Sequence, residues 1–180
     1  MEKTNEFGIE THHLFIDFKS AYDTIKRGQL YNAMSEFNIS NKLIRLTRMS
    51  MENIKSQVRI QSDLSDLITT KKGIRQGDSL ACLLFNLALE KVVRNAGIQT
   101  SGTIFYKSVQ LLAYADDIDK IARSRTALKE AFLSLESAAG EIGLRINEKK
   151  TKYLTTRESK NQQRYFQIKN FNFEAVQSFT

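Results

Sequence analysis

Proline and tryptophan are absent from the 180-residue chain, and cysteine occurs once, as Cys82. A single thiol cannot form an internal disulfide, and no cysteine–histidine cluster has the spacing of a zinc site. No apolar run approaches the roughly 20 residues that a membrane span needs. The polar N-terminus, residues 1–13, does not resemble a secretory signal peptide. We therefore expect an intracellular protein, nuclear or cytoplasmic, that is not secreted and has no membrane partner.

Basic residues outnumber acidic ones, with 27 Lys and Arg against 20 Asp and Glu and a formal net charge of +7. A basic surface favours polyanions, because neutralised phosphates release their counterions. Many soluble proteins carry such a charge, so the charge alone does not decide whether the partner is a nucleic acid. The hydrophobic fraction of 41% is enough for a core, and the length suits one domain, which we expect over residues 1–180.

Short apolar runs alternate with helical patterns along the chain, which is typical of a mixed α/β domain. We expect strands at 13–18, 56–61, 68–72, 109–114 and 118–122, and helices at 29–36, 42–51, 79–94 and 128–142. Gly143 lies where a helix end favours a left-handed residue. Residues 145–180 indicate short strands around a charged loop at 157–164. An antiparallel sheet with helices on one face could bring the acidic ends of two strands together.

Those acidic strand ends are Asp17 and the pair Asp116 and Asp117, at the tip of the expected hairpin. Carboxylates gathered at one point repel each other, and a divalent cation removes that cost. Oxygen ligands suit Mg²⁺, and two such ions about 4 Å apart can activate a 3′-hydroxyl and stabilise a leaving pyrophosphate. Asp-Asp is also a common turn dipeptide, because Asp tolerates positive φ. The pair by itself therefore does not decide between a turn and a metal site.

Four segments, taken in order, resemble the reverse transcriptase motifs of non-LTR (LINE-like) retrotransposons over roughly residues 14–153. They are L-F-I-D-F-K-S-A-Y-D at 14–23, G-I-R-Q-G-D-S-L-A-C-L-L-F-N at 73–86, A-Y-A-D-D at 113–117 and G-L-R-I-N-E-K-K-T-K at 143–152. The resemblance implies the polymerase palm, an α/β (α+β) fold with an antiparallel sheet backed by helices. It also implies RNA-directed DNA polymerase activity by two-metal nucleotidyl transfer.

The first and third motifs contain the residues that the resemblance assigns to the metals. Asp17 and Asp116 match metal-binding aspartates, and Asp117 matches their acidic neighbour. The backbone carbonyl of Phe18 would also face a metal. Tyr22 matches the bulky aromatic that excludes a ribose 2′-hydroxyl and so selects deoxynucleotides. The implied cofactors are two Mg²⁺ ions, with Mn²⁺ as the alternative ion.

The second and fourth motifs contain the residues expected near the nucleotide. Gln76 and Gly77 match residues close to the incoming nucleotide and template, and Arg75 precedes them in the same string. Glycine permits a close approach of the backbone. Lys150 matches a lysine near the pyrophosphate leaving group, a candidate proton donor, although a solvated basic run would look the same. The implied partners are an RNA template, a DNA primer and a dNTP.

One position of the third motif departs from the family pattern. Lys120 stands in the strand after the aspartate pair, where the family usually has an aliphatic residue. A buried lysine without a partner costs several kcal/mol, so we expect Lys120 to reach the surface or to pair with Asp119 or Glu141.

We also make predictions about several further side chains. We expect His12 and His13 at the surface, and Cys82 in the core as a buried thiol. A set of basic residues either lines a template path or is simply solvated: Arg45, Arg48, Arg59, Lys71, Lys72 and Arg75.

The motifs span a palm core of about residues 13–156, and residues 157–180 would begin the primer-grip region. Few residues precede Asp17, so the fingers would be partial, and a thumb would be absent. Two functions therefore stay open at this point. The chain is either a reverse transcriptase domain or an inactive truncated remnant that folds and at most binds nucleic acid.

Overall fold

The computed structural model describes residues 8–97, 109–114, 117–156 and 164–178. The chain divides into two compact units. Residues Met1–Lys19 and Val92–Thr180 form the first, which we call the sheet unit. Residues Ser20–Lys91 form the second, the helical unit. The prediction of one domain over residues 1–180 stays a prediction.

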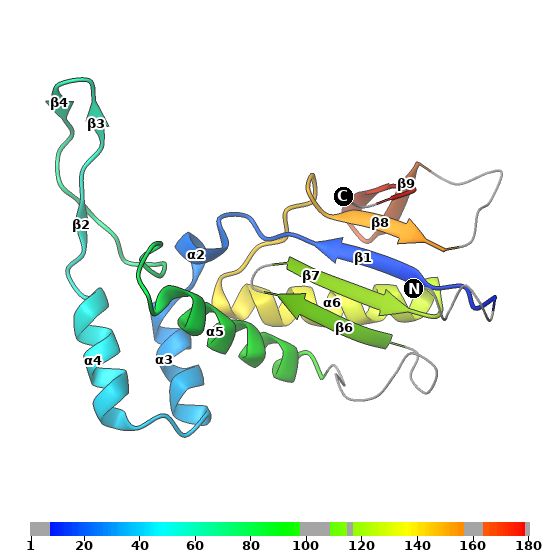
Figure 1. Ribbon diagram of the computed structural model, residues 1–180, viewed down its shortest axis with the longest axis horizontal. Coiled ribbons are helices and arrows are strands. Elements are labelled where there is room, and N and C mark those ends of the chain that lie inside the picture. The colour runs from blue at the N-terminus through cyan, green and yellow to red at the C-terminus, as the bar shows by residue number, and fades with distance from the viewer. Residues whose placement is uncertain (1–7, 98–108, 115–116, 157–163, 179–180) are drawn as a thin grey trace. The chain divides into compact units, whose positions relative to one another are not determined.

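The sheet unit is built on a six-stranded sheet with the order β6-β7-β1-β8-β10-β9 (Figure 1). Its strands are β1 (His12–Ile16), β6 (Val109–Tyr114), β7 (Asp117–Ala122), β8 (Lys152–Thr155), β9 (Tyr165–Ile168) and β10 (Phe171–Ala175). Neighbouring strands run antiparallel except β8 and β10, which pair in parallel. The strand that precedes Asp17 is therefore central, between β7 and β8.

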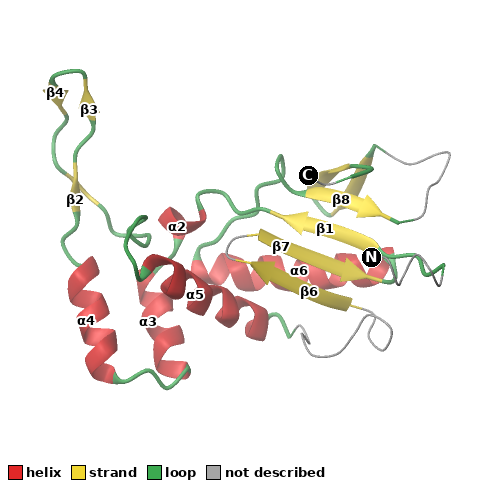
Figure 2. Cartoon of the chain, in the orientation of Figure 1, coloured by secondary structure: helices red, strands yellow, loops and turns green. Residues whose placement is uncertain are grey.

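Helix α6 (Arg125–Ile142) covers one face of this sheet, as Figure 2 shows. Its buried stripe includes Leu128, Phe132 and Leu135, which recur at helical spacing and have no exposed surface. The Ser124 hydroxyl caps the first turn by accepting a hydrogen bond from the Ala127 amide at 3.2 Å. Gly143 ends the helix with φ 102, as its position predicts.

The helical unit contains α2 (Ala21–Thr24), α3 (Arg27–Glu36), α4 (Asn41–Met51) and most of α5 (Ala81–Asn95). Two short ribbons lie between α4 and α5: β2 (Lys55–Ser56) pairs with β5 (Ile68–Thr69), and β3 (Arg59–Ile60) pairs with β4 (Asp63–Leu64). We call residues 52–72 the arm. Figure 1 shows the arm extending beyond the end of α4.

Arg27 ties the base of the arm to α3. Its guanidinium donates hydrogen bonds of 2.6–3.0 Å to the carbonyls of Met51, Thr70, Lys72 and Gly73. Because a guanidinium carries its five N–H donors in a fixed fork, one side chain can hold both chain segments that enter and leave the arm.

The predicted α/β architecture is confirmed, with a mainly antiparallel sheet backed by a helix. The predicted hairpin appears as β6 and β7, and the helices predicted at 79–94 and 128–142 appear as α5 and α6. The short helix α2 was not predicted. None of the described helices combines the length and apolarity needed to cross a membrane.

Three side chains contradict the predictions about burial. His12 and His13, expected at the surface, are only 4% and 2% exposed. They are buried because neighbouring strands supply polar partners; His12 Nδ1, for example, lies 2.7 Å from the Tyr153 hydroxyl. Burial lowers the pKa of His12, which favours its neutral form. Cys82, expected in the core, is exposed on α5.

Lys120 is also placed differently from the prediction. Its side chain is 0% exposed, and its ammonium group donates to the carbonyl of Ala131 on α6 at 2.5 Å. The expectation that it would reach the surface or pair with Asp119 or Glu141 is wrong, because a backbone carbonyl is its partner. Burial lowers the pKa of Lys120 from 10.5 to about 7.

Candidate active site

Asp17 follows β1 directly, and hydrogen bonds hold both its main chain and its side chain. Its carbonyl accepts a 2.8 Å hydrogen bond from the Asn147 amide, and its own amide donates to the Thr151 hydroxyl at 3.3 Å. The Asn147 side-chain amide donates to Asp17 Oδ1 at 2.8 Å. The ammonium group of Lys150 lies 4.0 Å from Asp17 Oδ2. The Asp17 side chain is 27% exposed, so its carboxylate is fixed and still open to a ligand.

Phe18 continues this pairing with the segment that follows α6. It forms an isolated antiparallel bridge with Ile146, and its side chain is 4% exposed. The bridge brings the first and fourth motifs side by side. The expected contact between the Phe18 carbonyl and a metal stays a prediction.

Asp117 begins β7 at the same end of the sheet. The register pairs Ile16 with Ile118 across β1 and β7, so Asp17 and Asp117 occupy the next positions of neighbouring strands. Asp117 is exposed. Asp116, the other predicted metal ligand, lies outside the described residues.

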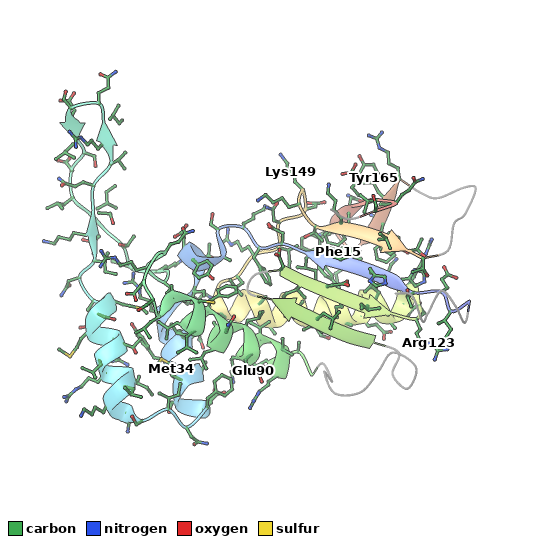
Figure 3. The ribbon with its side chains drawn as sticks, viewed as in Figure 1. Phe15, Met34, Glu90, Arg123, Lys149 and Tyr165 are labelled. Carbon is green, nitrogen blue, oxygen red and sulfur yellow. The ribbon has the colours of Figure 1, made fainter. Side chains whose placement is uncertain are left out.

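A cleft of about 730 Å³ opens at this end of the sheet. Its lining includes three acids, Asp17, Asp117 and Asp119, and three lysines, Lys149, Lys150 and Lys152. Figure 3 shows Phe15 on β1 and Lys149 on the segment before β8, and both also line the cleft. Mixed charges around an open cleft suit a ligand that carries both phosphates and metal ions.

Carboxylates at adjacent strand ends match the way proteins hold Mg²⁺. That ion takes one or two carboxylates and completes its shell with waters and substrate phosphates. Within the described ranges, no three Asp, Glu, His or Cys side chains gather closely enough to hold a metal ion. Of the three acids that line the cleft, Asp17 and Asp117 lie at adjacent strand ends, and these two carboxylates fit an oxygen-ligated ion that is shared with substrate.

The remaining predicted residues lie in the helical unit. Tyr22, on α2, is half-buried and stacks on Phe85 with ring centroids 4.8 Å apart. Its carbonyl accepts a 2.7 Å hydrogen bond from the Ile74 amide, which ties α2 to the second motif. Gln76 and Gly77 follow Ile74 in an exposed loop before α5.

Two glycines shape this loop through positive φ angles. Gly77 has φ +89 with open space around the position of a Cβ atom. Gly73 has φ +84, and a Cβ atom there would lie 2.9 Å from the Asp23 backbone. The second motif therefore depends on glycine at both positions, and Gly73 also allows close contact with the backbone of α2. Arg75, between the two glycines, is exposed.

Three residues of the cleft region were not predicted from the sequence. Asn147 and Thr151 lie inside the fourth motif but were not singled out, because their role depends on pairing with Asp17 across more than a hundred positions. Asp119 could have been found from the sequence. It follows Asp117 by two residues on a strand, and such residues share a face of the sheet.

The comparisons with known proteins agree with this geometry. The family model for "Reverse transcriptase (RNA-dependent DNA polymerase)" matches residues 2–173. The chain is 24% identical over 135 residues to a Pol polyprotein from a type-1 R2 retrotransposable element of Nasonia vitripennis. It is 26% identical over 143 residues to the corresponding R2 polyprotein of Bradysia coprophila. The matches cover 75% and 79% of this chain but only 13% and 16% of those relatives.

Solved structures with the same fold include two yeast telomerases. Telomerase from Candida albicans, in complex with a fragment of telomeric RNA, superposes with a TM-score of 0.68 at 12% identity, over 96% of this chain and 31% of that one. A Candida tropicalis telomerase complex gives a TM-score of 0.66 at 16% identity, over 92% and 28%. These structures share the fold; the family match over residues 2–173 shows that the chain belongs to the reverse transcriptase family, and its R2 relatives identify it as a domain of the non-LTR retrotransposon type.

Proposed function

We propose that the cleft of the sheet unit performs RNA-directed DNA synthesis, joining a dNTP to a primer 3′-hydroxyl on an RNA template. The observation that carries the proposal is the placement of Asp17 and Asp117 at the ends of adjacent strands, in one cleft with Lys150. The family of the chain supports the same reaction.

Asp17 and Asp117 would hold divalent ions, Mg²⁺ first and Mn²⁺ as the alternative, together with Asp116 through the family resemblance. When bound, two such ions activate the attacking hydroxyl and stabilise the leaving pyrophosphate. In the step itself, the primer 3′-hydroxyl loses its proton to water, its oxygen forms a bond to the α-phosphorus, and the bond from that phosphorus to the bridging oxygen breaks. Pyrophosphate then leaves with its charge neutralised.

Residues around the carboxylates supply position and charge. Asn147 donates to Asp17 and so keeps one carboxylate oxygen pointed in a fixed direction. Lys149, Lys150 and Lys152 give the cleft positive charge that attracts a triphosphate. Lys150 would donate the proton that leaves with pyrophosphate, because its ammonium group is the one near Asp17.

The loop of the second motif would contact the nucleotide. Gln76 and Gly77 would lie against the incoming base and template, beside Arg75, and Tyr22 would screen the sugar at its 2′ position. The RNA template, the DNA primer and the dNTP are the proposed partners.

The test is primer extension by the purified chain on an RNA template with Mg²⁺. We expect Asp17→Asn to lose at least about 100-fold in rate, because the amide cannot neutralise a bound cation. Asp66→Asn removes a similar charge from the exposed arm and serves as the control, with an unchanged rate. Extension by Asp17→Asn at the wild-type rate would refute the site. Salt-sensitive RNA binding without incorporation, under Mg²⁺ or Mn²⁺, would favour the inactive remnant instead.

A further inference from the structure

Asp119 and His13 form a buried polar pair beside the candidate active site. Asp119 Oδ2 lies 3.1 Å from His13 Nδ1, and the two side chains are 17% and 2% exposed. Asp119 lines the cleft and follows Asp117 by two residues on the same face of β7. The pair therefore links Asp119, which lines the cleft, to His13, a buried residue of β1.

The pair continues into a hydrogen-bonded network across three strands. The other ring nitrogen of His13, Nε2, lies 3.1 Å from the Thr11 hydroxyl. The Thr11 amide donates to the Thr156 hydroxyl at 2.9 Å, and the Thr156 amide donates back to the Thr11 carbonyl at 3.0 Å. The network thus runs from β7 through β1 to the end of β8.

The order carboxylate, imidazole, hydroxyl also occurs in nucleophilic enzymes, but burial excludes that role here. Thr11 is only 1% exposed, so no substrate can reach its hydroxyl. A nucleophile must contact the reacting atom directly. The network can affect the reaction only by holding the strands that it connects.

Those strands carry the candidate catalytic carboxylates. In the register of β1 and β7, Asp119 lies opposite Phe15 and His13 lies opposite Ile121, so the pair crosses diagonally between the strands. A slip of one residue would turn either side chain to the other face and break the pair. Asp17 follows β1 directly, and Asp117 begins β7. The pair therefore specifies the register that brings these two carboxylates together.

One oxygen of the pair carries a cost in stability. Asp119 Oδ1 is buried and has no hydrogen-bond partner among the described residues. A buried carboxylate oxygen without a partner is destabilising, and well-packed apolar side chains in place of a buried ion pair are often neutral or stabilising. A geometric role accounts for the presence of a polar pair that stability does not require.

We propose that Asp119 and His13 are positioning residues, which hold the ends of β1 and β7 in the geometry that nucleotidyl transfer needs. The catalytic part of this role rests on the proposed function. The structural part, a register lock between two strands, stands on the contacts alone.

The test compares four variants of the 180-residue chain: Asp119→Leu, Asp119→Asn, the double variant His13→Leu with Asp119→Leu, and His12→Leu. Asp119→Asn keeps an acceptor for His13, while Asp119→Leu removes it. His12→Leu removes a buried histidine from the opposite face of the same strand, where it meets Tyr153. Each variant is measured for kcat and KM of dNTP incorporation, for RNA affinity, for urea unfolding, and for amide exchange at residues 12–17 and 117–122.

We expect Asp119→Leu and the double variant to lower kcat by roughly tenfold to a hundredfold, with KM and RNA affinity unchanged. Both should exchange faster at the two strand ends. Asp119→Asn should recover most of the rate, and His12→Leu should lose stability without a loss of kcat. The double variant should be no slower than Asp119→Leu, because the two residues act as one unit.

A double variant that is stable and fully active, or a His12→Leu variant that is equally slow, would overturn the proposal. Wild-type chain without Asp17-dependent extension would instead refute the proposed function. In that case amide exchange still decides the register lock: unchanged protection at both strand ends in Asp119→Leu would reject it.

Discussion

At the scale of single residues, Lys120 determines part of the pH dependence of stability. Its pKa is 10.5 in a solvated chain and about 7 in the folded protein. Above pH 10.5 the amine is neutral in both states and burial costs little. As the pH falls toward 7, the unfolded state gains a proton that the folded state resists, so the free energy of unfolding decreases. Below pH 7 the loss is complete, at about 5 kcal/mol.

We therefore expect the unfolding free energy of the wild type to rise between pH 7 and pH 10 relative to Lys120→Met. The variant replaces the amine with an apolar side chain of similar size, so it should be the more stable protein at pH 7 by a few kcal/mol. Urea unfolding at several pH values measures the difference. A difference that stays constant from pH 7 to pH 10 would show that Lys120 does not titrate in this way.

Two glycines of the second motif give a matched pair of substitutions. Gly77→Ala should cost about 1 kcal/mol, because a left-handed φ strains an alanine even where space is open. Gly73→Ala should cost at least about 2 kcal/mol more, because its Cβ atom would also meet the Asp23 backbone at 2.9 Å. Denaturant midpoints of the two variants measure the order, and equal destabilisation would contradict the contact.

Burial of individual polar residues was the least predictable property of the sequence. His13 lies in the apolar strand β1; Thr11 is a partner nearby in the chain, but the partner Asp119 lies 106 positions away. Helix α6 buries Lys120. The carbonyl of Ala131 on that helix becomes the partner of Lys120 only after the helix packs on the sheet. Neither pairing leaves a local signal, because each depends on tertiary contacts.

At the scale of elements, the longer helices and the β6–β7 hairpin were predictable because their patterns are long or sharply bounded. Helix α6 repeats apolar residues along one stripe and ends at Gly143, and both signals are local. The pairing of β1 with β7 was expected only in outline, from the acidic strand ends, and the pairing of β1 with β8 was not predicted. The arm was expected as one strand pair, and it forms two short ribbons, β2–β5 and β3–β4.

The arm depends on Arg27, because isolated two-stranded ribbons are marginally stable in water. Arg27→Lys replaces a fork of donors with a single ammonium group and leaves several of the four carbonyls without this partner. We expect faster tryptic cleavage within residues 52–72, with Arg45→Lys on the exposed face of α4 as the control. Equal cleavage of the arm in both variants would show that Arg27 does not anchor it.

At the scale of the whole molecule, the net charge of +7 predicts salt-sensitive binding of RNA. The basic residues suggested for a template path are all exposed: Arg45, Arg48, Arg59, Lys71, Lys72 and Arg75. If about three to six of the cations contact phosphates, the logarithm of affinity should fall with the logarithm of salt with a slope of about −2 to −4.

Replacing Lys71 and Lys72 with alanine should reduce that slope by about 1.4, at about 0.7 for each lost phosphate contact on a single strand. Fluorescence anisotropy with a labelled RNA at several salt concentrations measures both slopes. An unchanged slope in the double variant would place the base of the arm away from the RNA.

The central position of β1 also has a consequence for the order in which the protein is made. Thr11, next to β1, is hydrogen-bonded to Thr156, which follows it by 145 positions. A ribosome that adds about 5 to 20 residues per second needs roughly 7 to 30 s to cover that distance. During this interval β1 has been synthesised, but its neighbour β8 is not complete. Asp17, the first of the candidate catalytic carboxylates along the chain, is thus among the last to acquire its surroundings, and chaperones have that time to bind β1.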